Sequence, residues 1–308
     1  MHNHRREIID EVLYDLKRLQ ADPVFPNPYA VEANIAFFEA MKSSGRYFKW
    51  LAGPARRLEG ERLLEVNDLL PKWDAEMHRS LMVMERKKFP GLTVPILSRL
   101  RDLVLESGKE IFVVANVGCG GMEIERQLVR ALERERYAGK VVFVGIDRSP
   151  AARKIAEENM RSAAAVEVRD IKNLDQAVLK ESLRVLKQPY TVLLCPNDIF
   201  TLDQVFKNKP FDVVFHSLFK HHLAALQQRE LDRVLAAVAH MVLEYDGYKS
   251  WPMMVPQSIT IWPQPILLAA TIFSDLRYAT KPELRRTAGS GRISFTRIGT
   301  YLLERPSR

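Results

Sequence analysis

The stretch Ile111-Phe112-Val113-Val114-Ala115-Asn116-Val117-Gly118-Cys119-Gly120-Gly121 decides the fold of this chain. An apolar run that opens directly into glycines predicts a buried strand followed by a tight turn, and residues 123–132 then have the pattern of a helix. Strand, glycine turn and helix form the first half of a βαβ nucleotide-binding unit. The missing side chains let the backbone approach a ligand at the carboxyl end of the strand.

A second predicted strand, residues 140–147, ends on Asp147. This acid follows the glycines by about 20 to 30 residues, where such folds bind ribose hydroxyls, and a carboxylate can accept two hydrogen bonds from a vicinal diol. Glu123 occupies the position of the third glycine of a dinucleotide fingerprint. Because its negative charge at a helix N-terminus would repel a pyrophosphate, the pattern favours a ligand without phosphates.

These residues resemble the class I S-adenosylmethionine-dependent methyltransferases, whose first motif is an apolar strand, an acid and then Gly-x-Gly-x-Gly. The resemblance covers roughly residues 109–308. Asn116 stands where the family usually has Asp or Glu, and Met122 where it often has a third glycine. The amide oxygen of Asn116 can still accept a hydrogen bond from the methionyl ammonium, although it lacks the full charge.

Strands and helices alternate after Ile111. Further strands are predicted at residues 190–195, 211–217 and 241–246, and a terminal hairpin joins residues 292–296 and 300–304 about Gly299. Ser149-Pro150 predicts the start of a helix, whereas residues 163–189 form an insertion with a short strand and a helix. With the resemblance, this order implies an α/β, Rossmann-like sheet of seven mostly parallel strands with a C-terminal antiparallel hairpin.

The chain is therefore expected to have two parts, a helical N-terminal extension over residues 1–108 and a Rossmann-like S-adenosylmethionine-binding domain over residues 109–308. The extension either stabilises the fold or acts as a lid over the substrate. A lid would use its aromatic side chains to exclude water from the reaction. These are Phe37, Phe38, Tyr47, Phe48, Trp50 and Trp73.

Composition excludes several classes of protein. The 308 residues are 47% hydrophobic and 27% charged, which is typical of a soluble globular protein. Two cysteines without metal-ligand spacing, and no signal segment, indicate a reducing cytoplasm. Residues 251–272 are apolar, but their prolines argue against a transmembrane helix and favour a pocket wall or core. No metal site and no Ser or Cys nucleophile triad is apparent.

The formal net charge of +8 permits an acidic partner such as nucleic acid. The excess falls mostly in the later part of the chain, without a dense basic run interleaved with aromatic residues. A solvated, moderately basic surface is therefore favoured over a nucleic-acid groove. The sequence predicts no oligomeric state.

The resemblance to the family implies a set of cofactor-binding residues. The backbone of Gly118, Cys119 and Gly120 would lie along the methionyl part of S-adenosylmethionine, with Asn116 facing its amino-acid end. Asp170 and Asp198 compete for the adenine amino group, and Asp198 is preferred because it follows the stronger apolar strand. The other residues expected at the cofactor are Asp147 and Arg148 beside the ribose, Asn197 and Ile199 beside the adenine, and His216, Ser217 and Leu218 flanking the ligand.

The segment after the fourth expected strand contains His221-His222-Leu223, which resembles a His-His-Leu signature of many small-molecule methyltransferases. Methyl transfer is an in-line displacement at a sulfonium, so a general base is needed only when the acceptor must lose a proton. His221 and His222 are the candidate catalytic residues, since imidazole titrates near neutral pH. The alternative is that one of them caps a helix or packs against the sheet.

The leading interpretation is an S-adenosylmethionine-dependent methyltransferase that acts on a small metabolite, with hydrophobic acceptors among the options. An RNA methyltransferase is the alternative that the basic excess suggests. A non-catalytic binding module that kept the fold is the alternative that Asn116 and Met122 suggest.

Overall fold

The computed structural model describes residues 2–59, 62–84, 86, 91–163, 165–296 and 299–307. The chain forms two compact units: unit 1 comprises Met1–Leu81 and Gly247–Lys281, and unit 2 comprises Met82–Asp246 and Pro282–Arg308. These units differ from the expected boundary at residue 108. Helix α6 (Val94–Glu106) belongs to unit 2 because its apolar face, Ile96, Leu100 and Val104, packs in the same core as the first strand.

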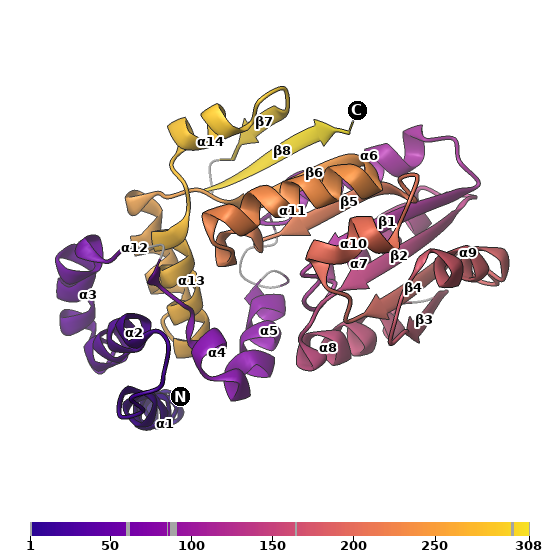
Figure 1. Ribbon diagram of the computed structural model, residues 1–308. Coiled ribbons are helices and arrows are strands. Elements are labelled where there is room, and N and C mark those ends of the chain that lie inside the picture. Colours follow the sequence, from indigo (N-terminus) through magenta and orange to yellow (C-terminus); the bar gives the residue numbers. More distant parts are fainter. Residues whose placement is uncertain are drawn as a thin grey trace. The chain divides into compact units, whose positions relative to one another are not determined.

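A sheet of eight strands forms the centre of unit 2 (Figure 1). Its order is β3-β4-β2-β1-β5-β6-β8-β7. The pairs β1·β2, β1·β5, β2·β4, β3·β4 and β5·β6 are parallel, and β7·β8 is antiparallel. The strands are β1 (Ile111–Val117), β2 (Lys140–Ile146), β3 (Val166–Asp170), β4 (Tyr190–Cys195), β5 (Phe211–Ser217), β6 (Ala239–Gly247), β7 (Arg292–Phe295) and β8 (Thr300–Pro306).

This architecture confirms the Rossmann-like α/β fold with a C-terminal antiparallel hairpin that the resemblance to class I methyltransferases implied. The expected number of seven strands is wrong, because the insertion at residues 163–189 contributes β3 to the sheet. Strand β4 pairs with both β2 and β3, so β3 lies at the edge. Of its side chains only Val168 is buried, as an edge position allows.

The helices of unit 2 cover both faces of the sheet. Alternate residues of a strand point to opposite faces. Phe112 and Val114 of β1 therefore pack in one core with α6, α7 (Glu123–Arg134) and α8 (Pro150–Arg161). Val113 and Ala115 pack in another core with α9 (Gln176–Arg184) and α11 (Ala225–Val238), which Figure 1 shows along the sheet. The shorter helices of this part are η5 (Ile199–Thr201), α10 (Leu202–Val205), η6 (Lys220–His222) and α14 (Lys281–Thr287).

The predicted start of α8 is confirmed. The Ser149 hydroxyl accepts a hydrogen bond from the backbone N–H of Ala152 at 3.0 Å, and Pro150 is the first helical residue. Both features satisfy or remove donors that a helix N-terminus leaves without a partner. This cap fixes where the chain turns after β2, directly beside Asp147.

Unit 1 is helical and has an aromatic core. The Phe37 ring contacts Phe38, Tyr47 and Trp50 edge to face, with ring centroids 5.2 to 5.9 Å apart. The Tyr47 hydroxyl lies 2.6 Å from Ser258 Oγ. These aromatic side chains pack inside unit 1, and a lid role stays a prediction. The helices are α1 (His2–Gln20), α2 (Pro28–Ala40), α3 (Ser44–Ala52), η1 (Pro54–Arg57), α4 (Val66–Leu69), η3 (Pro71–Trp73), α5 (Asp74–Val83), α12 (Trp251–Ile261) and α13 (Pro265–Arg277).

The apolar segment after β6 folds as the two helices α12 and α13, which belong to unit 1. Pro265 begins α13, in agreement with the preference of proline for the first helical turn. None of the helices that the structure describes is both long enough and apolar enough to cross a membrane.

Candidate functional site

The glycine turn between β1 and α7 requires its glycines. Gly118 and Gly120 have φ angles of 67° and 49°, in the left-handed region. A Cβ atom on Gly118 would lie 2.3 Å from the Phe219 ring, so a side chain at that position would also lack space. The backbone N–H groups of Gly118 and Cys119 donate to the Ile146 carbonyl at 2.8 and 3.3 Å. The turn is thereby attached to the end of β2.

Asp147 follows β2 and contacts the same turn. Its Oδ2 accepts from the backbone N–H of Gly120 at 3.0 Å, and its Oδ1 accepts from Ser149 N–H at 2.9 Å. The side chain is half-buried. Each oxygen of an ionised carboxylate can accept a second hydrogen bond, so both remain able to accept from the hydroxyls of a ligand. The structure therefore brings together the glycines and the acid that the sequence singled out.

The carboxylate of Glu123 lies at the N-terminus of α7 and is paired with two arginine side chains. Arg126 donates to it through Nε and Nη2 at 3.0 and 2.7 Å, and Arg86 donates through Nε at 2.7 Å. Burial alone would raise the pKa of Glu123, but the hydrogen bonds from Arg126 and Arg86 lower it below its usual value. The position at which a dinucleotide fold binds its pyrophosphate is thus occupied by a negative side chain.

Asn116 lies on the α7 face of β1 and contacts a residue that the sequence did not single out. Its Nδ2 donates to Glu125 Oε1 at 2.6 Å, and the two side chains are almost completely buried. Within the described residues, neither Asn116 Oδ1 nor Glu125 Oε2 has a hydrogen-bond partner. Burial raises the pKa of Glu125 to about 7. The sequence did contain an indication that Glu125 is buried. Residue 125 lies on the same face of the helix as the apolar residues Leu128, Val129 and Leu132.

Asp198 and Arg148 meet at the carboxyl ends of two neighbouring strands. Arg148 Nη2 lies 2.6 Å from Asp198 Oδ2, and Asp198 Oδ1 also accepts from Phe200 N–H at 3.1 Å. Because β4 pairs directly with β2, Asp198 lies one strand from Asp147. Asp170 is exposed at the end of β3, one strand further away.

Asn197 and Ile199 flank Asp198, but their surroundings differ. The Asn197 side chain accepts from Leu174 N–H at 3.2 Å and donates to the Leu174 carbonyl at 2.7 Å. Both of its polar atoms therefore hold the segment that leads into α9. Ile199 is half-buried and packs against the core on the α11 face of the sheet.

His216, Ser217 and Leu218 come at the end of β5. His216 is fully buried, and burial lowers the pKa of its imidazole, which is therefore neutral near pH 7. Neither ring nitrogen has a hydrogen-bond partner in the described part of the chain. Ser217 and Leu218 are half-buried, and Leu218 N–H donates to the Tyr245 carbonyl at 2.9 Å with a φ of 52°.

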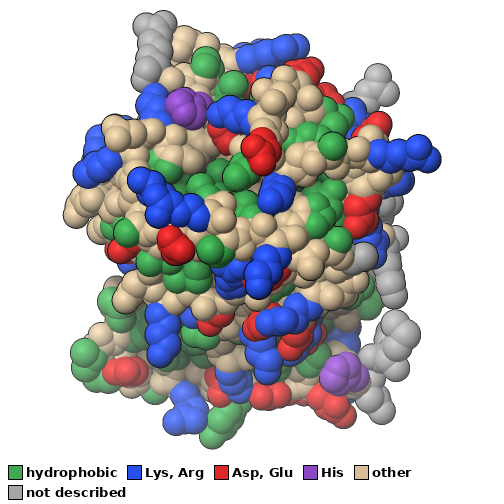
Figure 2. All heavy atoms as spheres, turned by 90° about the vertical axis from the view of Figure 1, so that its right-hand side faces the viewer, with side chains coloured by type: hydrophobic (Ala, Val, Ile, Leu, Met, Phe, Trp, Pro, Cys, Tyr) green, Lys and Arg blue, Asp and Glu red, His purple; other side chains and the backbone are tan. Residues whose placement is uncertain are grey.

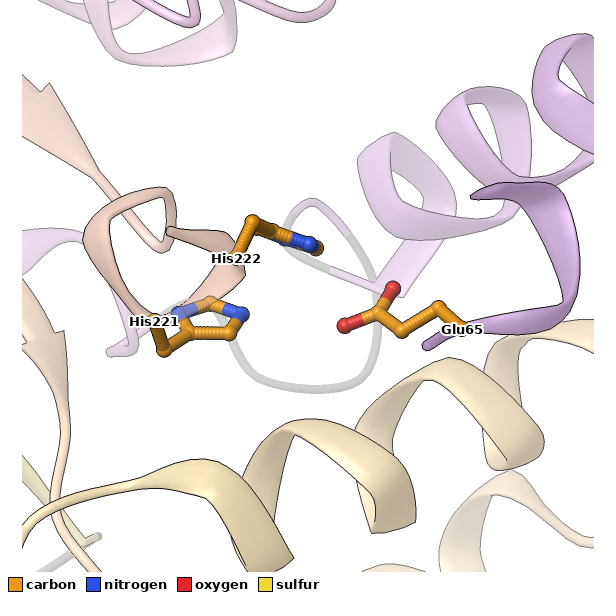
Figure 3. A group of neighbouring side chains, drawn as sticks. All are labelled: Glu65, His221 and His222. Carbon is orange, nitrogen blue, oxygen red and sulfur yellow. The ribbon is translucent and has the colours of Figure 1, made fainter. Parts of the chain in front are cut away.

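His221 and His222 lie side by side on η6, with ring centroids 4.2 Å apart (Figure 3). His221 Nδ1 is 2.9 Å from Asp246 Oδ1, and its backbone N–H donates to Asp246 Oδ2 at 3.3 Å. Asp246 is the last residue of the strand predicted at residues 241–246. Its contact with His221 follows from the parallel pairing of β5 and β6, which brings their carboxyl ends together. Glu65, also drawn in Figure 3, belongs to unit 1 and accepts a hydrogen bond from Ser274 there.

A partly buried charged cluster holds the start of η6. Lys220 Nζ lies 2.7 Å from Asp232 Oδ1 and 2.8 Å from Glu244 Oε2, and Arg305 Nη1 lies 3.1 Å from each of the same two oxygens. Burial alone would raise the pKa of Glu244, but the neighbouring cations, Lys220 foremost, lower it to about 2. The charges of the two carboxylates and the two cationic side chains therefore balance. Their contacts attach η6 to β6, β8 and α11.

Comparison with known proteins gives only distant likenesses. No protein-family model and no curated protein matches the sequence. Of the solved structures, the methyltransferase domain of bacterial CtHen1 is 13% identical, with a TM-score of 0.43 over 69% of this chain and 98% of that one. The plantazolicin methyltransferase BpumL, in complex with S-adenosylhomocysteine, is 12% identical, with a TM-score of 0.42 over 98% of this chain and 100% of that one.

A third solved structure, a SAM-dependent methyltransferase from Methanosarcina mazei, is 14% identical. It has a TM-score of 0.39 over 66% of this chain and 95% of that one. These three likenesses are too distant to assign a function.

Proposed function

We propose that unit 2 binds S-adenosylmethionine at the glycine turn and that the protein transfers its methyl group to a small acceptor. The observation that carries this proposal is the attachment of the left-handed Gly118 to Gly120 turn to the carboxylate of Asp147. A nucleoside whose ribose diol donates to Asp147 would have its 5′ substituent along the glycines.

The other residues of the site are compatible with this ligand. Asp198 and Ile199, one strand from Asp147, would provide a carboxylate and an apolar side chain for the adenine. Asn116 has a buried amide oxygen without a hydrogen-bond partner in the described chain, and this oxygen can accept from the methionyl ammonium. S-adenosylmethionine would supply the activated methyl group, while the protein orients both reactants and excludes water.

His221 is the candidate base for an acceptor that must lose a proton. The carboxylate of Asp246 beside Nδ1 favours the tautomer with its hydrogen on that nitrogen. Nε2 then carries the lone pair that takes up a proton, as in other histidines oriented by a carboxylate. We infer that Asp246 orients His221. We also infer that the adjacent ring of His222 lies at the same acceptor site.

On one face of the molecule (Figure 2), the arrangement of charges favours a small acceptor over RNA. On the face shown in Figure 2, the Lys and Arg side chains are interspersed with Asp and Glu and with hydrophobic side chains. A protein that binds the phosphates of RNA usually gathers its basic side chains into a patch or stripe. Affinity for tRNA that falls steeply with salt concentration would instead support an RNA methyltransferase.

Calorimetry with S-adenosylhomocysteine tests the cofactor assignment. Asp147→Asn keeps one acceptor oxygen for the turn but loses the charge and the second acceptor. We expect its affinity to fall about 10-fold to 100-fold, because hydrogen bonds to a charged group contribute about 1.5 to 3 kcal/mol each. Asp102→Asn makes the same change on the surface of α6, where Asp102 pairs with Arg101, and should bind like the wild type.

Unchanged binding by Asp147→Asn would refute the ribose assignment. Thermal stabilisation by NAD, but not by S-adenosylhomocysteine, would refute the choice of cofactor. Binding without methylation of any acceptor would favour a non-catalytic module.

The adenine assignment has its own test, because two acids compete for it. Asp198→Ala should weaken S-adenosylhomocysteine binding, whereas Asp170→Ala should not, since Asp170 lies one strand further from Asp147. The opposite result would assign the adenine contact to Asp170 at the end of β3.

A further inference from the structure

We propose that Glu125 and Asn116 act together as a relay that binds the cationic amino group of the ligand at the glycine turn. The ammonium would donate to Asn116 Oδ1, while Asn116 Nδ2 donates to Glu125 Oε1. Glu125 is then a positioning residue, because its charge acts through the Asn116 amide. This inference rests on the proposed function and adds a residue of helix α7 to the same site.

The geometry of the pair directs the amide oxygen away from Glu125. A planar amide that donates through Nδ2 to a carboxylate 2.6 Å away presents its oxygen in the same plane, on the opposite branch from Cγ. That oxygen is buried, and no described residue donates to it. Because burying an acceptor without a hydrogen bond is costly, a ligand donor at this position would be stabilising.

The charges around α7 support the same conclusion. Glu123 and Glu125 are both buried in the first turns of this helix. Glu123 is paired with Arg86 and Arg126, whereas the structure records no Lys or Arg pairing with Glu125 among the described residues. Within the described part of the chain, the titratable groups recorded as interacting with Glu125 are Glu123 on its own helix and the Cys119 thiol in the turn, and neither is a cation. A ligand ammonium would provide the missing positive charge.

A proton should leave the protein when that cation binds. Burial raises the pKa of Glu125 to about 7, so near neutral pH a large fraction of this carboxyl is protonated. A neighbouring positive charge favours the ionised form and lowers the pKa. At pH 7, binding of an amino-bearing ligand should therefore release about half a proton.

Two ligands separate this role from general support of the turn. S-adenosylhomocysteine carries the amino group, whereas 5′-methylthioadenosine has the same nucleoside and thioether but lacks both the amino group and the carboxylate. Glu125→Gln keeps an acceptor for Asn116 and removes the charge. We expect this variant to bind S-adenosylhomocysteine about 10-fold to 100-fold more weakly, with unchanged affinity for 5′-methylthioadenosine. Glu133→Gln, on the exposed side of the same helix, should bind both ligands like the wild type.

A charge exchange provides the converse test. Asn116→Asp combined with Glu125→Gln moves the carboxylate from the helix to the strand, where it can contact the ammonium directly. This double variant should regain most of the affinity for S-adenosylhomocysteine that Glu125→Gln loses. If it does not, the charge is not what the ligand requires.

Proton release in the wild type keeps the proposal testable even if the variants fold poorly. Titrations in two buffers of different ionisation enthalpy should give about half a proton released with S-adenosylhomocysteine at pH 7, and none with 5′-methylthioadenosine. Equal proton exchange with both ligands, or equal weakening of both by Glu125→Gln, would overturn the relay and leave the proposed function standing. Failure of the wild type to bind either ligand would refute the proposed function itself.

Discussion

Glu125→Gln should make the stability of unit 2 less dependent on pH, even without any ligand. Gln has nearly the same shape and can still accept from Asn116 Nδ2. It removes only a carboxyl whose charged form is disfavoured by burial, which raises its pKa from an ordinary value of 4.5 to about 7. The variant therefore isolates the effect of burying this acid.

The magnitude follows from the two pKa values. A raised pKa in the folded state means that the stability contributed by Glu125 is fully present below pH 4.5 and is lost as the pH rises through about 7. Each pH unit in this interval changes the free energy of unfolding by at most about 1.4 kcal/mol. Between pH 4.5 and pH 8, the variant should therefore gain on the order of 3 kcal/mol relative to the wild type.

The assay must report on unit 2 alone. Native-state hydrogen exchange of the β1 and α7 amides, measured over a range of pH, gives the free energy of opening of these elements. Tryptophan fluorescence would not serve, because all four tryptophans belong to unit 1. Glu133→Gln is the control and should keep the pH dependence of the wild type. The free energy of opening should differ between Glu125→Gln and the wild type by an amount that changes with pH. A difference that stays constant from pH 4.5 to pH 8 would refute the reasoning.

Three further substitutions test left-handed glycines and the charged cluster. Gly289→Ala should cost about 1 to 2 kcal/mol of stability, because its φ of 58° is left-handed but no atom lies within 4 Å of the position that a Cβ would take. Gly118→Ala has a similar φ and must also displace the Phe219 ring, so it should cost about 1 to 3 kcal/mol more in urea unfolding followed by circular dichroism. Equal losses of stability in the two glycine variants would mean that the Phe219 ring moves aside without cost. Lys220→Met should destabilise unit 2 by on the order of 3 kcal/mol, since it leaves the buried Glu244 with Arg305 as its remaining cation; an effect below about 1 kcal/mol in the same assay would contradict this.

Much of the fold could be predicted because it depends on local patterns. The apolar runs of β1, β4 and β5 were predicted at their observed positions, and the start of α8 followed from the Ser149-Pro150 pair. The turn after β1 was predictable because only glycine adopts its backbone conformation without strain. Residues 163–189 were less regular, and the position of β3 at the edge could not be derived from them.

The candidate site was predictable only in part. Parallel strands place their carboxyl ends together, so the proximity of Asp147 to the glycine turn could be expected from the order of the elements. The contacts of Asn116 with Glu125 and of His221 with Asp246 were not anticipated. Each joins two elements whose mutual orientation depends on how their apolar faces pack.

The sequence by itself determined the strand, the glycine turn and the helix that follows, because periodicity and backbone preference act over a few neighbouring residues. Only the tertiary structure decided that β4 lies between β2 and β3, that residues 247–281 join the N-terminal helices, and that a buried acid lies beneath the turn. These features depend on contacts between segments far apart in the chain. The free energy of such contacts comes from burial and charge pairing that no local pattern records.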